Sequence, residues 1–140
     1  MSQNNKKKNM NIVYMPVDSE ENFYYYWLVF LKPFHPLVNK EMIIAAEFLY
    51  QRQLLSEVIS DPELVDTALL SKDIAEKIKE KHQLSDSYYK VIISNFRKNG
   101  FLQDEKVNPK YIPNREFGEK TFQLTFHFDL RNVDKDKKLQ

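Results

Sequence analysis

Apolar residues recur with the helical period through the middle of the chain. Over residues 39–59 they fall three or four positions apart, Asn39 stands where a helix N-cap is expected, and Pro62 follows the last of them. This pattern predicts one long helix. Residues 62–70 keep apolar positions at the same spacing and predict a short helix or turn.

Two further helices are predicted where a serine precedes a periodic segment. Ser71 and Ser85 each offer a hydroxyl that accepts a hydrogen bond from a free N–H of a first helical turn. The helices that they begin span residues 72–81 and 86–99, with a tight turn between them. Gly100 follows the second helix, at the position where a left-handed residue commonly ends one.

Apolar runs before these helices predict strands. Residues 12–17 contain Pro16, which suits an edge strand. Residues 23–31 are mostly aromatic or β-branched and predict a strand with two apolar faces. Such a strand is either covered on both sides or presents one side to a partner. The side chains expected at a partner surface are Tyr24, Tyr25, Tyr26 and Trp27, with Phe34 from a proline-rich elbow.

The last part of the chain predicts a β-hairpin. Residues 101–102 begin a strand after Gly100, and residues 121–128 alternate strictly between apolar and polar side chains. Pro and Gly residues mark turns in the polar stretch between them. The apolar face of the second strand carries Phe122, Leu124, Phe126 and Phe128.

Length and composition describe a single globular domain. The residues are 42% hydrophobic and 29% charged, a composition that is typical of a folded chain. At 140 residues, the chain is too short for two ordinary domains. Cysteine is absent, which excludes disulfides and thiolate metal ligands. The expected divisions are a basic tail at 1–11, one domain at 12–128 (12–38 strands and elbow, 39–100 helices, 101–128 hairpin) and a charged tail at 129–140.

No segment predicts a membrane span or a secretory signal. The longest apolar stretch, residues 23–31, is far shorter than the roughly 20 residues that a membrane helix needs. Residues 1–11 lack the apolar core of a signal peptide. We therefore expect no membrane partner, and a location in the cytoplasm of a host cell or in a virion.

The order of these elements, from residue 39 to residue 128, resembles the winged helix-turn-helix superfamily. The residues that carry the resemblance are 70–75, the turn at 84–85, and 94–102, where a basic helix end, a glycine and two apolar residues lead into a wing. The lysine- and asparagine-rich composition, with extra strands ahead of the motif, is similar to phage- or plasmid-encoded members such as replication initiators. The resemblance implies an α+β fold and either DNA binding or protein docking.

In DNA-binding members of that superfamily the third helix enters the major groove. By position, Arg97 would then contact guanine, and Lys90 and Lys98 would contact phosphates. A solvated helix face is the alternative explanation for the same residues. The full set that the resemblance implies for DNA is Ser85, Ser87, Lys90, Ser94, Arg97 and Lys98 on the helix, with Arg115 and Lys120 on the wing.

Charge is distributed unevenly along the chain, although the net charge is only +1. Residues 71–111 carry nine Lys or Arg against six Asp or Glu, whereas residues 12–70 carry three against nine. Arg115 and Lys120 lie beside Glu116 and Glu119, which opposes strong DNA binding by the wing. A dipolar chain of this kind either binds DNA on one side or stacks head-to-tail with copies of itself.

No motif in the sequence predicts catalysis. His35, His82 and His127 share no metal-ligand spacing, and the two glycines form no phosphate-binding loop. We therefore expect no enzyme activity, cofactor or small-molecule substrate. The function favoured by the sequence is a structural or adaptor subunit of a large, phage-type assembly, with other protein subunits or copies of itself as partners. The alternative is a duplex-DNA-binding transcription regulator or replication initiator.

Overall fold

The computed structural model describes residues 11–116 and 118–133, and within them the chain is mostly helical with one small antiparallel sheet, an arrangement compatible with the α+β class. The outer parts of both expected tails, residues 1–10 and 134–140, lie outside the described residues. The elements are α2 (Glu20–Phe30), η1 (Lys32–Phe34), α3 (Asn39–Val58), α4 (Pro62–Leu69), α5 (Lys72–His82), α6 (Asp86–Asn99), β1 (Leu102–Gln103), β2 (Lys106–Val107) and η2 (Pro109–Tyr111).

The helices predicted after residue 38 are confirmed. The Ser71 hydroxyl accepts a hydrogen bond from the N–H of Ile74, and Gly100 ends α6 with a φ of 85°. Ser85 caps α6 in the same way as Ser71 caps α5. The start of α3 differs by one residue from the prediction, because Asn39 is its first helical residue. The Glu41 carboxylate there accepts from the N–H of Val38 at 3.2 Å.

The strand predicted over residues 23–31 is wrong, because this segment is helical and belongs to α2. A continuous apolar run contains both the strand period and the helix period, so periodicity alone does not separate them. The signal for a helix lies just ahead of the run. The Ser19 hydroxyl accepts from the N–H of Asn22 at 3.1 Å, and Glu20 and Glu21 occupy the positive end of the helix dipole.

The hairpin predicted over residues 101–128 is much smaller in the structure. β1 pairs with β2 through Leu102↔Val107 and Gln103↔Lys106, so the turn consists of only two residues. Residues 121–128 form no strand, and neither do residues 12–17. Alternation makes a segment suitable for a sheet, but a strand also needs a neighbouring backbone to pair with, and within the described residues no backbone pairs with these two segments.

The hairpin turn gives a first testable prediction. Asp104 and Glu105 have φ values of 54° and 60°, a left-handed conformation that costs a residue with a Cβ roughly 1–2 kcal/mol. Both Glu105→Gly and Glu105→Gln remove the carboxylate, but only glycine relieves this strain. We expect Glu105→Gly to be more stable than Glu105→Gln by about 0.5–1 kcal/mol in urea unfolding. Equal stabilities would contradict the turn geometry.

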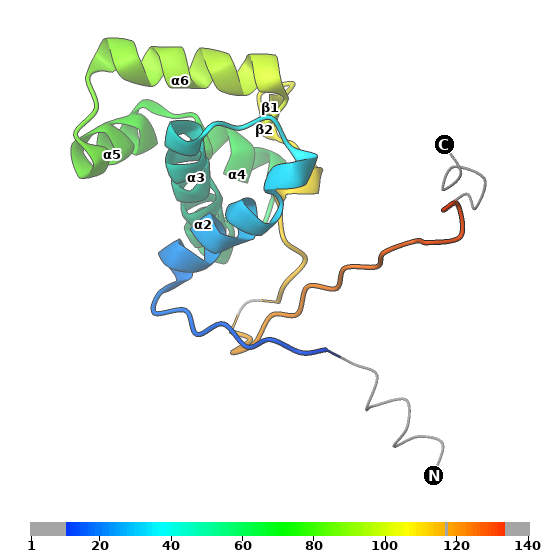
Figure 1. Ribbon diagram of the computed structural model, residues 1–140. Coiled ribbons are helices and arrows are strands. Elements are labelled where there is room, and N and C mark those ends of the chain that lie inside the picture. The colour runs from blue at the N-terminus through cyan, green and yellow to red at the C-terminus, as the bar shows by residue number, and fades with distance from the viewer. Residues whose placement is uncertain (1–10, 117, 134–140) are drawn as a thin grey trace, which may run out of the picture.

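The core is built around α3, which lies at the centre of the helices in Figure 1, with α6 across the top of the view. Phe48 of α3 is fully buried, and its ring lies 5.6 Å from that of Phe96 and 6.5 Å from that of Phe101, centroid to centroid. α2 packs along α3 and is tied to the end of the fold by the Trp27 indole N–H, which donates to the Tyr111 carbonyl oxygen at 2.8 Å. Residues 123–133, in orange and red, extend away from the helices. None of the helices described here has the length and apolar character needed to cross a membrane.

Candidate interaction surfaces

One face of α6 carries most of the residues that the sequence predicted for DNA contact. Lys90 and Lys98 are exposed there, and Ser94 between them is half-buried. The opposite face of the helix is in the core, where burial raises the pKa of Tyr89 to about 12. Ser85 and Ser87, both exposed, lie at the helix start. Five of the six predicted residues, from Ser87 to Lys98, therefore lie along one side of α6, and Ser85 is its N-cap.

Arg97, the residue predicted to contact guanine, is paired within the chain. Its Nε and Nη2 atoms donate to the two carboxylate oxygens of Glu105 at 2.8 and 3.0 Å. These hydrogen bonds raise the pKa of Arg97 and lower that of Glu105. The neighbouring Asp104 is also exposed, so the hairpin tip presents two carboxylates. A wing that grips phosphate needs cations at this position.

A groove of about 640 Å³ separates α5 from α6 and reaches the hairpin. Its walls include the apolar Leu70 and Ile93, and its charges are mixed rather than uniformly basic. Lys79 donates to Asp86 at 2.6 Å and to Glu76 at 2.9 Å, contacts that raise the pKa of Lys79. The groove therefore offers little uncompensated positive charge.

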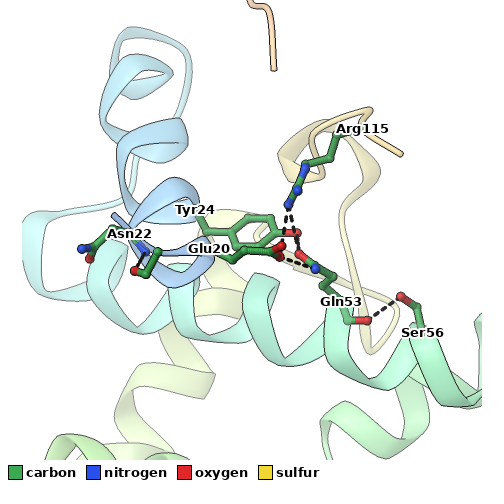
Figure 2. A network of polar contacts seen from close by, with 7 residues as sticks. Glu20, Asn22, Tyr24, Gln53, Ser56 and Arg115 are labelled. Carbon is green, nitrogen blue, oxygen red and sulfur yellow. Dashed lines mark hydrogen bonds and ion pairs between the residues drawn. The ribbon is translucent and has the colours of Figure 1, made fainter. Parts of the chain in front are cut away.

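The predicted wing residues Arg115 and Lys120 do not join the α6 face. Arg115, with 11% of its side chain exposed, lies against α2 and α3, where Nη1 donates to the Gln53 Oε1 atom at 3.2 Å and lies 3.5 Å from a Glu20 oxygen (Figure 2). Its guanidinium also covers the Phe23 ring at 5.0 Å. Lys120 is exposed on the extended segment that follows.

The contacts of Arg115 belong to a polar network between the N-terminal part of α2 and the C-terminal half of α3. Figure 2 shows Tyr24, Glu20 and Arg115 converging on the Gln53 side chain. The Tyr24 hydroxyl donates to Gln53 Oε1, and Gln53 Nε2 donates to Glu20. Burial raises the pKa of Tyr24. The network fixes the place where the C-terminal segment leaves the helices.

Removal of Arg115 is expected to release that segment. Arg115→Ala loses a partly buried charged hydrogen bond and a cation–π contact, and we expect the free energy of unfolding to fall by about 1–2 kcal/mol. Limited proteolysis after residue 115 is expected to become faster in the folded state. Lys120→Ala, at an exposed position, is the control and should leave both measurements unchanged. Equal behaviour of the two variants would contradict the anchoring role.

The predicted aromatic interface residues divide into buried and exposed groups. Tyr24 is buried, while Tyr25 and Trp27 are half-buried against the core. Tyr26 and Phe34 are exposed, Phe34 at 66%. Val29 and Phe30, which were not among the predicted interface residues, are exposed one turn after Tyr26 on the same side of α2. We call the four exposed side chains, Tyr26, Val29, Phe30 and Phe34, the α2 stripe.

The extended C-terminal segment, residues 121–133, is a second exposed apolar surface, and we call it the C-terminal arm. Its first apolar residue, Phe122, packs on α2, with ring centroids 5.1 Å from Phe23 and 5.6 Å from Trp27. Beyond Phe122 the apolar side chains are exposed. No backbone hydrogen bond between described residues involves residues 121–128. The exposed residues are Leu124, Phe126, Phe128, Leu130 and Val133.

A buried charged cluster fixes the end of α5 against α2 and α3. The Glu47 side chain, 3% exposed, accepts from Lys81 Nζ and from His82 Nε2, each at 2.8 Å. Gln51 donates to its other oxygen at 2.7 Å, and Lys81 also contacts Glu21 at 2.9 Å. Burial alone raises the pKa of Glu47, but the hydrogen bonds from Lys81, Gln51 and His82 outweigh burial and lower it.

The described residues show no arrangement for metal binding, since no three His, Asp or Glu side chains lie together in a suitable way. His35 and His82 are used in structural contacts. The Nε2 atom of His35 lies 2.9 Å from the Leu28 carbonyl oxygen, and the Nε2 atom of His82 donates to the Glu47 carboxylate. His127 is exposed on the C-terminal arm. The three histidines therefore occupy separate environments.

Comparison with known proteins found no similarity: no family model, curated protein or solved structure matches the chain. We therefore infer the function from the surfaces of the chain itself.

Proposed function

We propose that the chain is a non-enzymatic winged-helix module that serves as a structural or adaptor subunit of a large, phage-type assembly. The winged-helix assignment is supported by the order of α5, a short turn, α6 and the β1–β2 hairpin. The single observation that carries the docking function is the presence of two exposed apolar surfaces, the α2 stripe and the C-terminal arm. Apolar side chains gathered in this way are typical of a surface that another protein covers.

The charges on α6 support protein docking over DNA binding. Arg97 is held by Glu105, and the exposed hairpin tip adds the carboxylate of Asp104. Lys90 and Lys98 form no ion pair within the described part of the chain. Two lysines neutralise about two phosphates, which gives weak binding that moderate salt abolishes.

Duplex DNA binding by a transcription regulator or replication initiator is the second candidate. The observation that favours it is the alignment of Lys90, Ser94 and Lys98 along one side of α6. The Arg97–Glu105 pair is about half exposed, and such pairs contribute at most about 1 kcal/mol. A phosphate or a guanine is therefore able to compete for Arg97.

A fluorescence-anisotropy titration with a random-sequence duplex separates the two functions. We expect the wild-type chain to show no saturable binding at moderate salt. The double variant Lys90→Ala, Lys98→Ala tests the α6 face, and Lys32→Ala is the control because Lys32 lies on η1 and contacts Asn39. Salt-sensitive binding that the double variant alone abolishes would establish the DNA function and overturn the docking function.

A further inference from the structure

We propose that two copies of this chain exchange their C-terminal arms, so that the arm of each copy covers the α2 stripe of the other. The inference rests on the proposed docking function and names its partner as a second copy. It depends on three features of the chain: an arm suited to docking, an apolar surface beside the origin of that arm, and the area that the two bury together.

The arm has the properties of a segment that binds in an extended conformation. Its apolar side chains alternate with Thr, Gln and His, and the backbone of residues 121–128 is unpaired among the described residues. Phe128 is 87% exposed and Leu130 is 71% exposed. An extended segment of this kind gains side-chain burial when its exposed apolar residues dock on an apolar surface of another chain.

The α2 stripe lies close to the point where the arm begins. Phe122 is seated on Phe23 and Trp27, which occupy the flank of α2 next to Tyr26 and Phe30. From there the arm runs away from the helices of its own chain (Figure 1). A second copy related by a two-fold axis near Phe122 would receive this arm on its own stripe and return the same contact.

The areas favour a reciprocal contact over a single one. From the exposed fractions of their side chains, the stripe offers about 400 Å² and the arm about 600 Å², so one contact buries at most about 1,000 Å² in total. That value is at the level of weak contacts, whereas two reciprocal contacts bury up to about 2,000 Å², within the usual range of a specific interface. A closed pair of copies therefore reaches the area that stable association needs.

Charge at the end of the arm is compatible with this partner. Arg131 pairs with Asp129 on the same arm, through contacts of 2.9 and 2.8 Å, so the described end of the arm carries no net charge. The stripe itself consists of Tyr, Val and Phe side chains. A neutral arm on an apolar stripe requires neither a basic nor an acidic partner, which is the condition that two copies of one chain satisfy.

Sedimentation velocity over a concentration series tests the exchange. We expect the wild-type chain to form a dimer. The arm variant carries Phe126→Ser and Phe128→Ser, and the stripe variant carries Phe30→Ser and Phe34→Ser. Each variant should raise the dissociation constant of the dimer at least tenfold. The control is Val58→Ser, an exposed apolar position at the end of α3, which should leave the dimer intact. These side chains are between 45% and 87% exposed, so circular dichroism should show unchanged folding.

A mixture of the arm variant and the stripe variant distinguishes exchange from simple packing of two α2 helices. In a mixed dimer the intact arm of the stripe variant meets the intact stripe of the arm variant, so the mixture should associate more strongly than either variant alone. A mixture no stronger than its components overturns the exchange. A monomeric wild-type chain also overturns it but leaves docking to a different protein intact, whereas failure of the docking function appears separately, as duplex binding in the titration above.

Discussion

Replacing Phe48 with alanine is expected to lower the free energy of unfolding by about 3–5 kcal/mol. Phe48 is fully buried in α3, and its ring contacts the rings of Phe96, Phe101 and Tyr89. Its removal leaves a cavity where α3, α6 and the start of the hairpin meet, and aromatic rings around a cavity collapse only partly. The loss is therefore larger than the transfer free energy of the ring alone.

Urea unfolding of Phe48→Ala, monitored by circular dichroism, measures this loss. The matched control is Val58→Ala in the same helix, where the side chain is 80% exposed and the expected change is within about 0.5 kcal/mol. A loss below about 1 kcal/mol for Phe48→Ala would mean that the core is not centred on this ring.

Replacing Lys81 with methionine is expected to destabilise the fold by about 2–4 kcal/mol, because it leaves the buried Glu47 carboxylate without its cation. This loss of unfolding free energy is smaller than that expected for a fully buried ion pair, because the Lys81 side chain is 37% exposed. Glu47→Gln keeps the shape of the side chain and a polar group for Gln51, so its loss should be smaller. A Lys81→Met variant as stable as the wild type would show that Glu47 does not depend on this contact.

The same cluster predicts how stability changes with pH. The pKa of Glu47 is lowered in the folded chain from the usual value of 4.5. Its contribution to stability is therefore fully present above about pH 5, and it is lost as the pH falls through the folded-state pKa. We expect Glu47→Gln to be less stable than the wild type at neutral pH, and to lose less stability between pH 5 and about pH 3. Parallel pH profiles would contradict a charged Glu47.

The helices from α3 to α6 were predictable because their signals are local. Ser71, Ser85 and Gly100 act on backbone groups within one turn of themselves, and the apolar spacing of each helix selects its own buried face. α2 was not predictable from its apolar pattern, because a helix that is apolar on all sides satisfies the strand period equally well. The local signal for a helix is the cap at Ser19 with Glu20 and Glu21 behind it, and the helix then packs against α3.

The candidate DNA surface also has features that follow from local sequence and features that depend on the tertiary structure. Helical spacing places three basic residues on the exposed side of α6: Lys90, Arg97 and Lys98. The ion pair of Arg97 is not local in the same way. It depends on the two-residue turn, which places Glu105 beside Arg97, eight positions earlier in the chain. Arg115 was predicted for the wing, but it lies against Glu20 and Gln53, more than sixty positions away in the chain.

The sequence by itself determined the helical segments after residue 38 and the caps at Ser71, Ser85 and Gly100, since these depend on interactions within a few residues. Tertiary structure alone decided which side of residues 20–30 packs on α3, that the hairpin ends at Val107, and that the alternating residues 121–128 remain an unpaired arm. The physical reason is that strands and ion pairs need partners from distant positions. Only the folded chain brings those distant partners together. Segments that find no partner within the fold, such as residues 121–128, stay available to another chain.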